Sequence, residues 1–339
     1  MEYCDVLNTE LARPKSDGPL VVDLFAGCGG LALGFEAAGF KTVGFEMDSD
    51  AADSYRKNLS GDCHEVFLTP VTELPDAPVV IGGPPCQPFS VGGKQNGLKD
   101  ARDGFPAFLG AVERLQPDLW IFENVRGMMY RNKGYFEIIQ QELEALGYIV
   151  EVRLLNAVNF GVPQNRERVI CIGHRGSFDW PSPLPSRVSA GEALGELAAQ
   201  VPSDAKMLTP SMDQYIARYE AASKCANPRD LHLDRPARTL TTRNLYGATS
   251  DMHRIKLSDG RRRMLTIREA ARLQSFPDWF EFVGSEGSVM KQVGNSVAPL
   301  FAKSLATSVQ RYLASDRRLS ADQVAARRRI RVDQPELPM

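Results

Sequence analysis

Long apolar runs, paired cysteines and paired histidines are all missing from this sequence of 339 residues. No stretch approaches the roughly 18 apolar residues of a membrane-spanning helix, and the acidic start, with Glu2 and Asp5, is unlike the basic start of a signal peptide. The six cysteines lack CxxC spacing, and none of the four histidines is spaced as part of a metal pair. These absences predict a cytoplasmic protein with neither a disulfide framework nor a metal site.

A strong net charge is missing as well. The chain carries a net charge of −2, and with 43% hydrophobic and 24% charged residues it has the composition of an ordinary globular protein whose length favours two domains. The charge is unevenly spread, because residues 204–263 hold twelve Lys and Arg against seven Asp and Glu. Such a segment is either a phosphate-binding surface or a solvated basic face, and charge alone does not separate the two.

The first part of the chain shows the pattern of a site for a nucleotide-like cofactor. A short buried strand at 20–25 leads into the glycine-rich turn 26–30 and an apolar helix at 31–38. Glycines let the backbone and the helix N-terminus approach a cofactor closely. A second strand, at 42–45, ends at Glu46, whose carboxylate is placed to accept hydrogen bonds from a ribose diol. The pattern predicts an adenosine-type cofactor but does not distinguish NAD from S-adenosylmethionine.

A single cysteine lies in a rigid loop after another strand. The β-branched residues 79–81 indicate a buried strand, which runs through two glycines to Cys86, with prolines on both sides of the thiol. Proline fixes φ, so the loop presents Cys86 at the carboxyl end of a strand, where open α/β sheets bind their ligands. The strand predicted at 118–122 ends at Glu123, and the same rule places this carboxylate at the same edge.

Two arginines and a change of composition follow. Arg166 and Arg168 precede a predicted strand at 169–173 and, being two residues apart in an extended segment, are expected to share one face. From about residue 179 the chain is rich in proline, serine and arginine and has no clear periodicity, which indicates a domain boundary. The sequence thus predicts an α/β domain followed by a less regular one.

From Asp23 to about Leu313 the chain resembles the DNA (cytosine-5-)-methyltransferases of bacterial type, and the matching segments occur in the family's order. The segments that carry the resemblance are Pro84–Ser90, Glu123–Val125, Gln164–Arg168, Arg235–Thr242, Leu265–Pro277 and Gln292–Pro299. The resemblance implies an α/β fold with a Rossmann-like, S-adenosylmethionine-dependent methyltransferase sheet and a second, smaller target-recognition domain. It assigns residues 1–178 together with 288–339 to the catalytic and cofactor-binding domain, and 179–287 to the DNA-binding domain.

By the same resemblance, the activity is transfer of a methyl group from S-adenosylmethionine to carbon 5 of a flipped-out cytosine in duplex DNA, through a covalent adduct with Cys86. The implied catalytic residues are Cys86, Glu123, Arg166 and Arg168. The implied cofactor-binding residues are Phe25, Gly27, Gly29, Glu46, Met47, Pro85, Phe105, Asn295, Ser296 and Val297. The expected DNA-binding residues are Gln87, Ser90, Arg238, Thr239, Arg243, Asn244 and Arg254. The adenine contact is left open among Asp62, Glu65–Val66 and Pro70–Val71.

Three other functions compete with this one. A tRNA-methylating relative would share the catalytic residues, but the large basic recognition region argues against it. An NAD dehydrogenase would explain the glycine turn and Glu46, yet it gives no joint role to Cys86, Glu123 and the two arginines. A non-enzymatic DNA-binding module would be favoured only if Cys86, Glu123 or Arg168 had been lost.

The expected partners follow from the implied activity. The chain is predicted to act on double-stranded DNA as a monomer, in the bacterial cytoplasm and on the nucleoid, with no membrane involved. It is expected to be the modification enzyme of a restriction–modification system, with an endonuclease acting independently, or a solitary DNA methylase.

Overall fold

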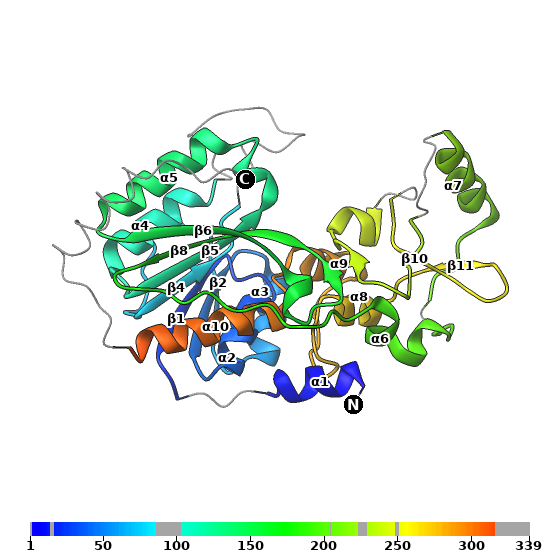
Figure 1. Cartoon of the computed structure of the whole chain (residues 1–339), viewed down its shortest axis with the longest axis horizontal. Helices are drawn as coiled ribbons and strands as arrows, with labels where there is room; N and C mark the ends of the chain where they lie inside the picture. Colours follow the sequence, from blue (N-terminus) through cyan, green and yellow to red (C-terminus); the bar gives the residue numbers. More distant parts are fainter. Residues whose placement is uncertain are drawn as a thin grey trace.

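The computed structural model describes residues 2–13, 17–85, 103–203, 205–222, 229–247 and 251–315, which form a larger and a smaller lobe (Figure 1). Three of the predicted site residues, Cys86, Gln87 and Ser90, lie outside the described residues.

The elements of the first half of the chain are α1 (Tyr3–Glu10), β1 (Leu20–Leu24), α2 (Gly30–Ala37), β2 (Lys41–Glu46), α3 (Ser49–Asn58), β3 (Cys63–Glu65), β4 (Val79–Gly82), α4 (Phe105–Leu115), β5 (Leu119–Val125), η3 (Arg126–Met129), α5 (Lys133–Ala145), β6 (Ile149–Asn156), η4 (Ala157–Phe160), β7 (Gln164–Asn165) and β8 (Glu167–His174). Those of the second half are α6 (Ala190–Leu194), η5 (Gly195–Ala198), α7 (Pro210–Ala222), β9 (Ala237–Arg238), η6 (Arg243–Gly247), β10 (Arg254–Lys256), β11 (Arg262–Met264), α8 (Ile267–Leu273), α9 (Glu286–Asn295) and α10 (Pro299–Leu313).

One sheet of seven strands, in the order β3-β2-β1-β4-β5-β8-β6, organises the larger lobe. The first five strands in this order are parallel to one another, whereas β8 is antiparallel to both β5 and β6. Parallel strands joined through helices place all their carboxyl ends at one edge. The expected Rossmann-like α/β fold is confirmed.

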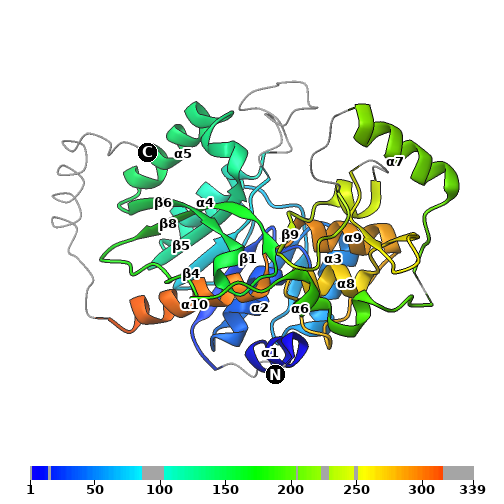
Figure 2. The ribbon, with the colours of Figure 1, turned by 45° about the vertical axis from the view of Figure 1, so that its right-hand side comes forward.

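Both faces of this sheet are buried, which explains its runs of apolar residues. Val21, Ile81 and Ile121 lie in one apolar cluster, while their strand neighbours Val22, Val80 and Trp120 lie in another. Successive side chains of a strand point to opposite faces, so each buried run supplies both clusters. Helices α2 and α10 cover one face, and α4 and α5 cover the other (Figures 1 and 2).

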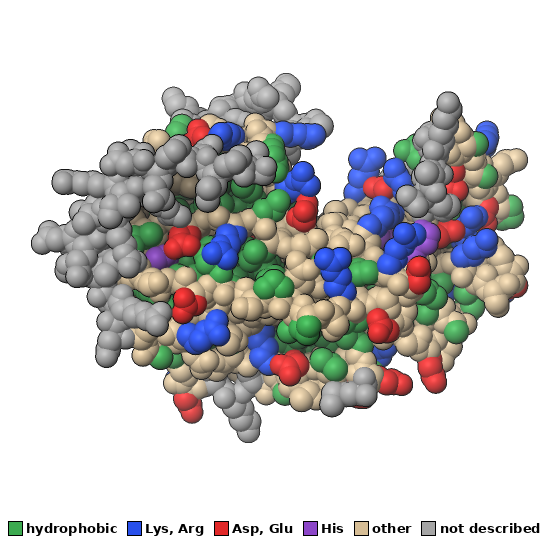
Figure 3. Space-filling view, viewed as in Figure 1, with side chains coloured by type: hydrophobic (Ala, Val, Ile, Leu, Met, Phe, Trp, Pro, Cys, Tyr) green, Lys and Arg blue, Asp and Glu red, His purple; other side chains and the backbone are tan. Residues whose placement is uncertain are grey.

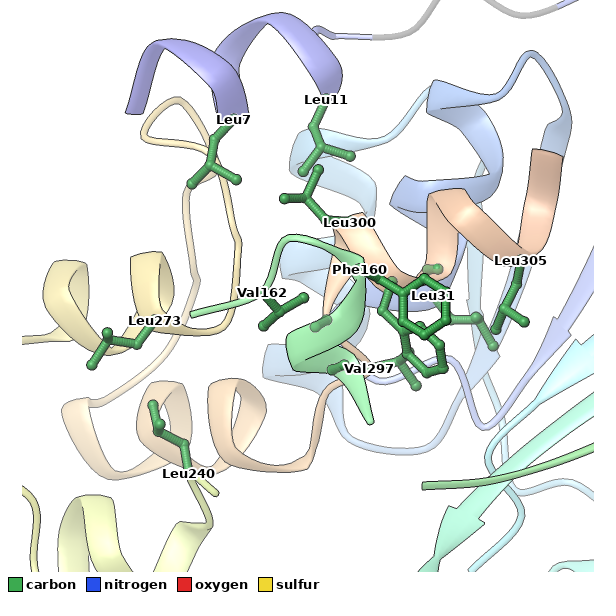
Figure 4. Close-up of a cluster of buried hydrophobic side chains, with 14 of the residues drawn as sticks. Leu7, Leu11, Leu31, Phe160, Val162, Leu240, Leu273, Val297, Leu300 and Leu305 are labelled. Atoms are coloured by element: carbon green, nitrogen blue, oxygen red, sulfur yellow. The ribbon is translucent and has the colours of Figure 1, made fainter. Parts of the chain in front are cut away.

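The end of the described chain returns to the first strand–helix unit. Helix α10 packs along α2 so closely that a Cβ on Gly34 would lie 2.4 Å from the Ala302 side chain. Leu300 and Leu305 join the cluster that also contains Leu31 and Phe160 (Figure 4). Residues far apart in sequence therefore complete one core.

A segment before α9 also packs on the larger lobe. Ala271, Phe276 and Phe280 share an apolar cluster with Ala32 of α2 and Tyr55 of α3. This cluster joins residues expected in the target-recognition domain to the cofactor-binding elements.

Ion pairs hold much of the smaller lobe together. Among the described residues its separate apolar cluster has Leu208, Ile216 and Met252 as buried members, while Leu231, Leu240, Leu245 and Ile255 belong to the core cluster shared with the larger lobe. The Arg263 guanidinium, by contrast, donates to both carboxylate oxygens of Glu269, and both side chains are completely buried. Buried charges of this kind must be paired to be tolerated, so much of this lobe depends on specific polar contacts.

Candidate active site

The glycine turn after β1 has the unusual backbone that close approach to a ligand requires. Phe25, Gly27 and Gly29 all have positive φ angles, of 59°, 55° and 87°. For Phe25 this conformation is rare, because a Cβ crowds the backbone there, and such strained residues cluster at functional sites. Gly30 faces the C-terminal segment so closely that a Cβ would lie 2.0 Å from Ser296 Oγ.

Glu46 fixes this turn from the end of β2. One carboxylate oxygen accepts the Gly27 N–H at 2.8 Å, and the other accepts the Met47 and Asp48 N–H groups, each at 2.9 Å. The carboxylate thus has a structural task beyond the ribose contact expected from the sequence, since it holds the glycine turn against the adjacent strand.

A cavity of about 600 Å³ lies at the carboxyl edge of the sheet, between the glycine turn, the end of β2 and the residues after α9. Eight of the ten expected cofactor residues line it, namely Phe25, Gly27, Glu46, Met47, Pro85, Asn295, Ser296 and Val297. Glu123 and Asn124 line the same cavity. Its volume suits a nucleoside-sized ligand. Its position beside β1 also does, because open α/β sheets bind ligands where the order of the strands reverses.

Phe105 and Gly29 are the two expected cofactor residues that are not among the described residues lining the cavity. The Phe105 ring is fully buried and packs edge-on against Phe122 and Tyr135. Phe105 therefore supports the wall from behind. Gly29 is the N-cap of α2, and a Cβ there would lie 2.4 Å from the Leu59 side chain. Its requirement for glycine comes from its positive φ and from the close Leu59 side chain.

Other cavity residues were not expected from the sequence. Asp23 is buried, one of its oxygens has no hydrogen-bond partner, and burial together with Glu46 raises the pKa of its carboxyl well above the ordinary value. Burial likewise raises the pKa of the Cys28 thiol to about 12, so this cysteine stays protonated. A buried carboxyl with one oxygen unbonded can bond a polar group of a ligand, but a strand aspartate gives no local signal of that role.

Val66 also lines the cavity, directly after β3. Of the three alignments left open for the adenine contact, this placement favours Glu65–Val66.

Glu123 and Arg168 form an ion pair at the edge of the cavity. Arg168 Nε lies 2.6 Å from Glu123 Oε1, and both side chains are 11% exposed. The next residue, Asn124, donates its side-chain N–H to the Pro84 carbonyl at 2.9 Å. The chain leading to Cys86 is therefore tied to β5 beside Glu123, although Cys86 itself lies beyond the described residues.

Arg166 is directed into the protein instead. Its guanidinium is buried and donates to the carbonyls of Leu240, Gly294 and Ser296 at 2.7, 3.0 and 2.8 Å. Burial, and secondarily Arg168, lowers its pKa. Arg166, implied above as a catalytic residue, here holds together the backbone at Leu240 and at Gly294 to Ser296.

The expected DNA-binding residues differ in accessibility. Arg243 is exposed, and the half-buried Arg238 is held by Asp251. The Thr239 hydroxyl donates to the Asn165 carbonyl, so it ties this segment to β7.

Arg254 and Asn244 do not match the expectation of base contacts. Arg254 is completely buried, with its guanidinium bonded to Asp230 and Glu220. Asn244 is 4% exposed, and its amide bonds to Thr239 and Thr241. In this structure both side chains stabilise the smaller lobe from inside, so the prediction that they read bases is corrected.

Lys and Arg side chains stand on both sides of the hollow between the lobes (Figure 3). Within the described ranges, no group of three or more His, Cys, Asp and Glu side chains is arranged to hold a metal ion. None of the helices in those ranges combines the length and apolar character needed to cross a bilayer.

The fold and the site define an α/β protein whose cavity suits an adenosine-type cofactor and has Glu123 at its edge. A family model described as C-5 cytosine-specific DNA methylase matches residues 20–311. The type II methyltransferase M.AplI of Arthrospira platensis is 57% identical over 91% of both chains, and M.NgoFVII of Neisseria gonorrhoeae is 34% identical over 87% of both. The chain therefore belongs to the C-5 cytosine-specific DNA methylases, which use S-adenosylmethionine.

Solved structures share this fold at low sequence identity. The Entamoeba histolytica methyltransferase EhMeth matches with a TM-score of 0.69 at 16% identity, covering 88% of this chain and 99% of that one. The Spodoptera frugiperda DNMT2 mutant matches with a TM-score of 0.66 at 18% identity, covering 88% and 100%.

Proposed function

We propose that this chain is the modification enzyme of a type II restriction–modification system, and that Cys86, Glu123 and Arg168 carry its cytosine-5 methylation. The observation that supports these roles most directly is the Glu123–Arg168 pair, which lies at the cavity edge beside the chain that leads to Cys86. An acid and a guanidinium beside a thiol are the groups that cytosine activation needs.

The chemistry assigns one task to each side chain. The Cys86 thiolate adds to carbon 6 of the cytosine, and the electron pair displaced toward ring nitrogen 3 is neutralised by a proton from Glu123. Arg168 donates hydrogen bonds to the carbonyl oxygen. Carbon 5 then takes the methyl group that S-adenosylmethionine would supply, with S-adenosylhomocysteine as the leaving group. The proton on ring nitrogen 3 returns to Glu123, and loss of the carbon 5 proton to a base expels the Cys86 thiolate and restores the ring.

The cofactor is proposed to occupy the cavity behind this pair. Phe25, Gly27 and Glu46 would hold its adenosine part, and Asn295 to Val297 would close the opposite wall. The cationic sulfonium suits a cavity whose walls include the carboxylate of Glu46.

Target recognition is assigned to the smaller lobe. Arg243 and Arg238 are the remaining candidates for base contacts, because both stay at least partly accessible. Gln87, Ser90 and Thr239 are proposed to contact DNA near the flipped base. The contacts of residues 271–280 with α2 and α3 support a recognition domain that begins near residue 179 and ends near 265.

The wider biological setting is also proposed. We expect a monomer acting in the cytoplasm on nucleoid DNA, with a cognate endonuclease that acts independently. The type II names of the relatives support the restriction–modification assignment.

Bisulfite sequencing of DNA from cells that express the chain tests this function. The expected result is one short sequence motif with protected cytosines at a fixed position. Expression of Cys86→Ala should remove the protection, and a chain that protects no cytosines would contradict the proposal.

A further inference from the structure

A buried polar junction joins the recognition segment 239–242 to the cofactor-side segment 294–296. Its three side chains are Gln164, Arg166 and Gln274, with exposed fractions of 0%, 1% and 0%. None of them comes from either of the two segments that they join.

Leu240 is held through both of its backbone polar groups. Its N–H donates to Gln164 Oε1 at 2.9 Å, and its carbonyl accepts from Arg166 at 2.7 Å. On the other side, the Ser296 carbonyl accepts from Arg166 at 2.8 Å and from Gln274 Nε2 at 2.6 Å. The Gln164 amide N–H closes the network by donating to Gln274 Oε1 at 2.5 Å.

The junction leaves the two segments little room to move independently. A Cβ on Gly294 would lie 2.5 Å from the Thr242 backbone nitrogen, so the two backbones are in contact. At the rim, the Thr242 hydroxyl donates to Asn295 Oδ1 at 3.2 Å. A buried polar group that is left without a hydrogen-bond partner costs free energy. A shift of Ser296 therefore favours a matching shift of Leu240, which keeps the shared hydrogen bonds intact.

The two segments face different ligands under the function proposed above, on which this inference rests. Asn295 and Ser296 line the cofactor cavity, while Thr239 and Leu240 lead into the exposed Arg243 of the recognition lobe. We propose that Gln164 and Gln274 are positioning residues that couple cofactor binding to recognition of the target sequence. By thermodynamic linkage, each ligand then raises the affinity for the other by the same factor.

The decisive measurement is this coupling factor in the full-length protein. S-adenosylhomocysteine cannot react, so its dissociation constant can be measured by calorimetry. It is measured once without DNA and once in the presence of the duplex that carries the target identified by bisulfite sequencing. In the wild type we expect the duplex to tighten this binding at least about fivefold, and the coupling to fall toward one in Gln274→Met, which keeps the side-chain volume but loses both hydrogen-bonding groups. Gln164→Met should behave alike.

Asn58→Leu is the matched control. Asn58 is also a buried amide that bridges separate segments, through the Ser54 and Glu281 carbonyls, but it lies outside the junction and the cavity lining. A general loss of packing would change thermal stability in both variants, whereas only the junction variants should lose coupling. Thr242→Val, at the exposed rim, provides a milder change if the glutamine variants fail to fold.

The outcomes separate two failures. A wild type that methylates its target but shows no coupling, or a Gln274→Met variant with coupling intact, would overturn this inference and leave the proposed function standing. A wild type that methylates no cytosine would overturn both.

Discussion

Arg168 Nε lies 2.6 Å from Glu123 Oε1, and the two residues come from antiparallel neighbours in the sheet. Glu123 Oε1 is buried and has no aligned hydrogen bond, so its contact with Arg168 is an ion pair. The register pairs Val125 with Arg168, which places the guanidinium beside a carboxylate two residues earlier.

Arg168→Ala should lower the turnover of methyl transfer by about 100- to 1,000-fold, because it removes a charge-stabilising donor and leaves Glu123 unpaired. Affinity for S-adenosylhomocysteine should change little, since Arg168 is not among the residues lining the cavity. Steady-state kinetics and calorimetry test the two statements. Arg175→Ala, just beyond the other end of β8, should remain active. Near-native turnover of the Arg168 variant would refute the assigned role.

Cys86→Ser should abolish turnover while DNA binding stays measurable. An ordinary thiol ionises with a pKa near 8.5, far more readily than a hydroxyl, and only the ionised form attacks carbon 6. The wild type should form a stable adduct on DNA that carries 5-fluorocytosine, because fluorine cannot leave as a proton. Denaturing gel electrophoresis detects this adduct, and its absence with cofactor present would count against the covalent route.

Glu46→Gln should weaken cofactor binding about tenfold or more, since the amide loses one of the charge-assisted contacts that fix Gly27 and the neighbouring backbone. Glu36→Gln is the matched control. Glu36 also accepts backbone N–H groups, from Ser60 and Gly61, but it is absent from the cavity lining. Titration with S-adenosylmethionine should show a raised KM only for the Glu46 variant. Equal effects in both would locate the loss in general stability.

Arg254→Ala should destabilise the protein by about 3–5 kcal/mol, because it leaves Asp230 and Glu220 without their buried partner. Arg243→Ala should instead leave stability unchanged and relax preference at one position of the target or weaken binding to all sequences alike. Denaturant unfolding and methylation of single-base variants of the target distinguish these results. A stable Arg254 variant with altered target preference would restore it as a base contact.

Acid sensitivity should originate partly at His253. Burial lowers the pKa of its imidazole to about 3, whereas the unfolded chain takes up this proton near pH 6.5. Protons are thus gained on unfolding between these values, so stability falls as pH falls, by about 1.4 kcal/mol per unit from this group. His253→Leu should flatten the dependence between pH 6.5 and 4. An unchanged slope in denaturant titrations would show that His253 is already protonated in the folded protein.

Local signals in the sequence were sufficient for most of the sheet and for the position of Glu123 at its carboxyl edge. The β-branched run before Cys86 forms β4, and Thr266 with Glu269 forms the capping box that begins α8. Such features depend on neighbouring residues alone, so a single sequence reveals them.

The burial of Arg254 could not be predicted in this way. Its partners Asp230 and Glu220 lie 24 and 34 residues away, and a basic residue in a basic segment looks like a surface group until the fold pairs it. Asp23 is similar, because the burial that raises the pKa of its carboxyl depends on elements from several parts of the chain. Long-range polar pairing leaves no local pattern to recognise.

The packing of α10 against α2 bears on how the protein is made. The ribosome synthesises α2 some 270 residues before α10, yet the two helices share one face of the sheet. Contacts at such sequence separation form late and slowly. During synthesis, the apolar surface of α2 therefore stays exposed while the smaller lobe emerges. The nascent chain should need chaperones most in that interval. A nascent chain stalled after β11 should be digested readily by protease within α2, and one stalled with α10 outside the ribosome should resist.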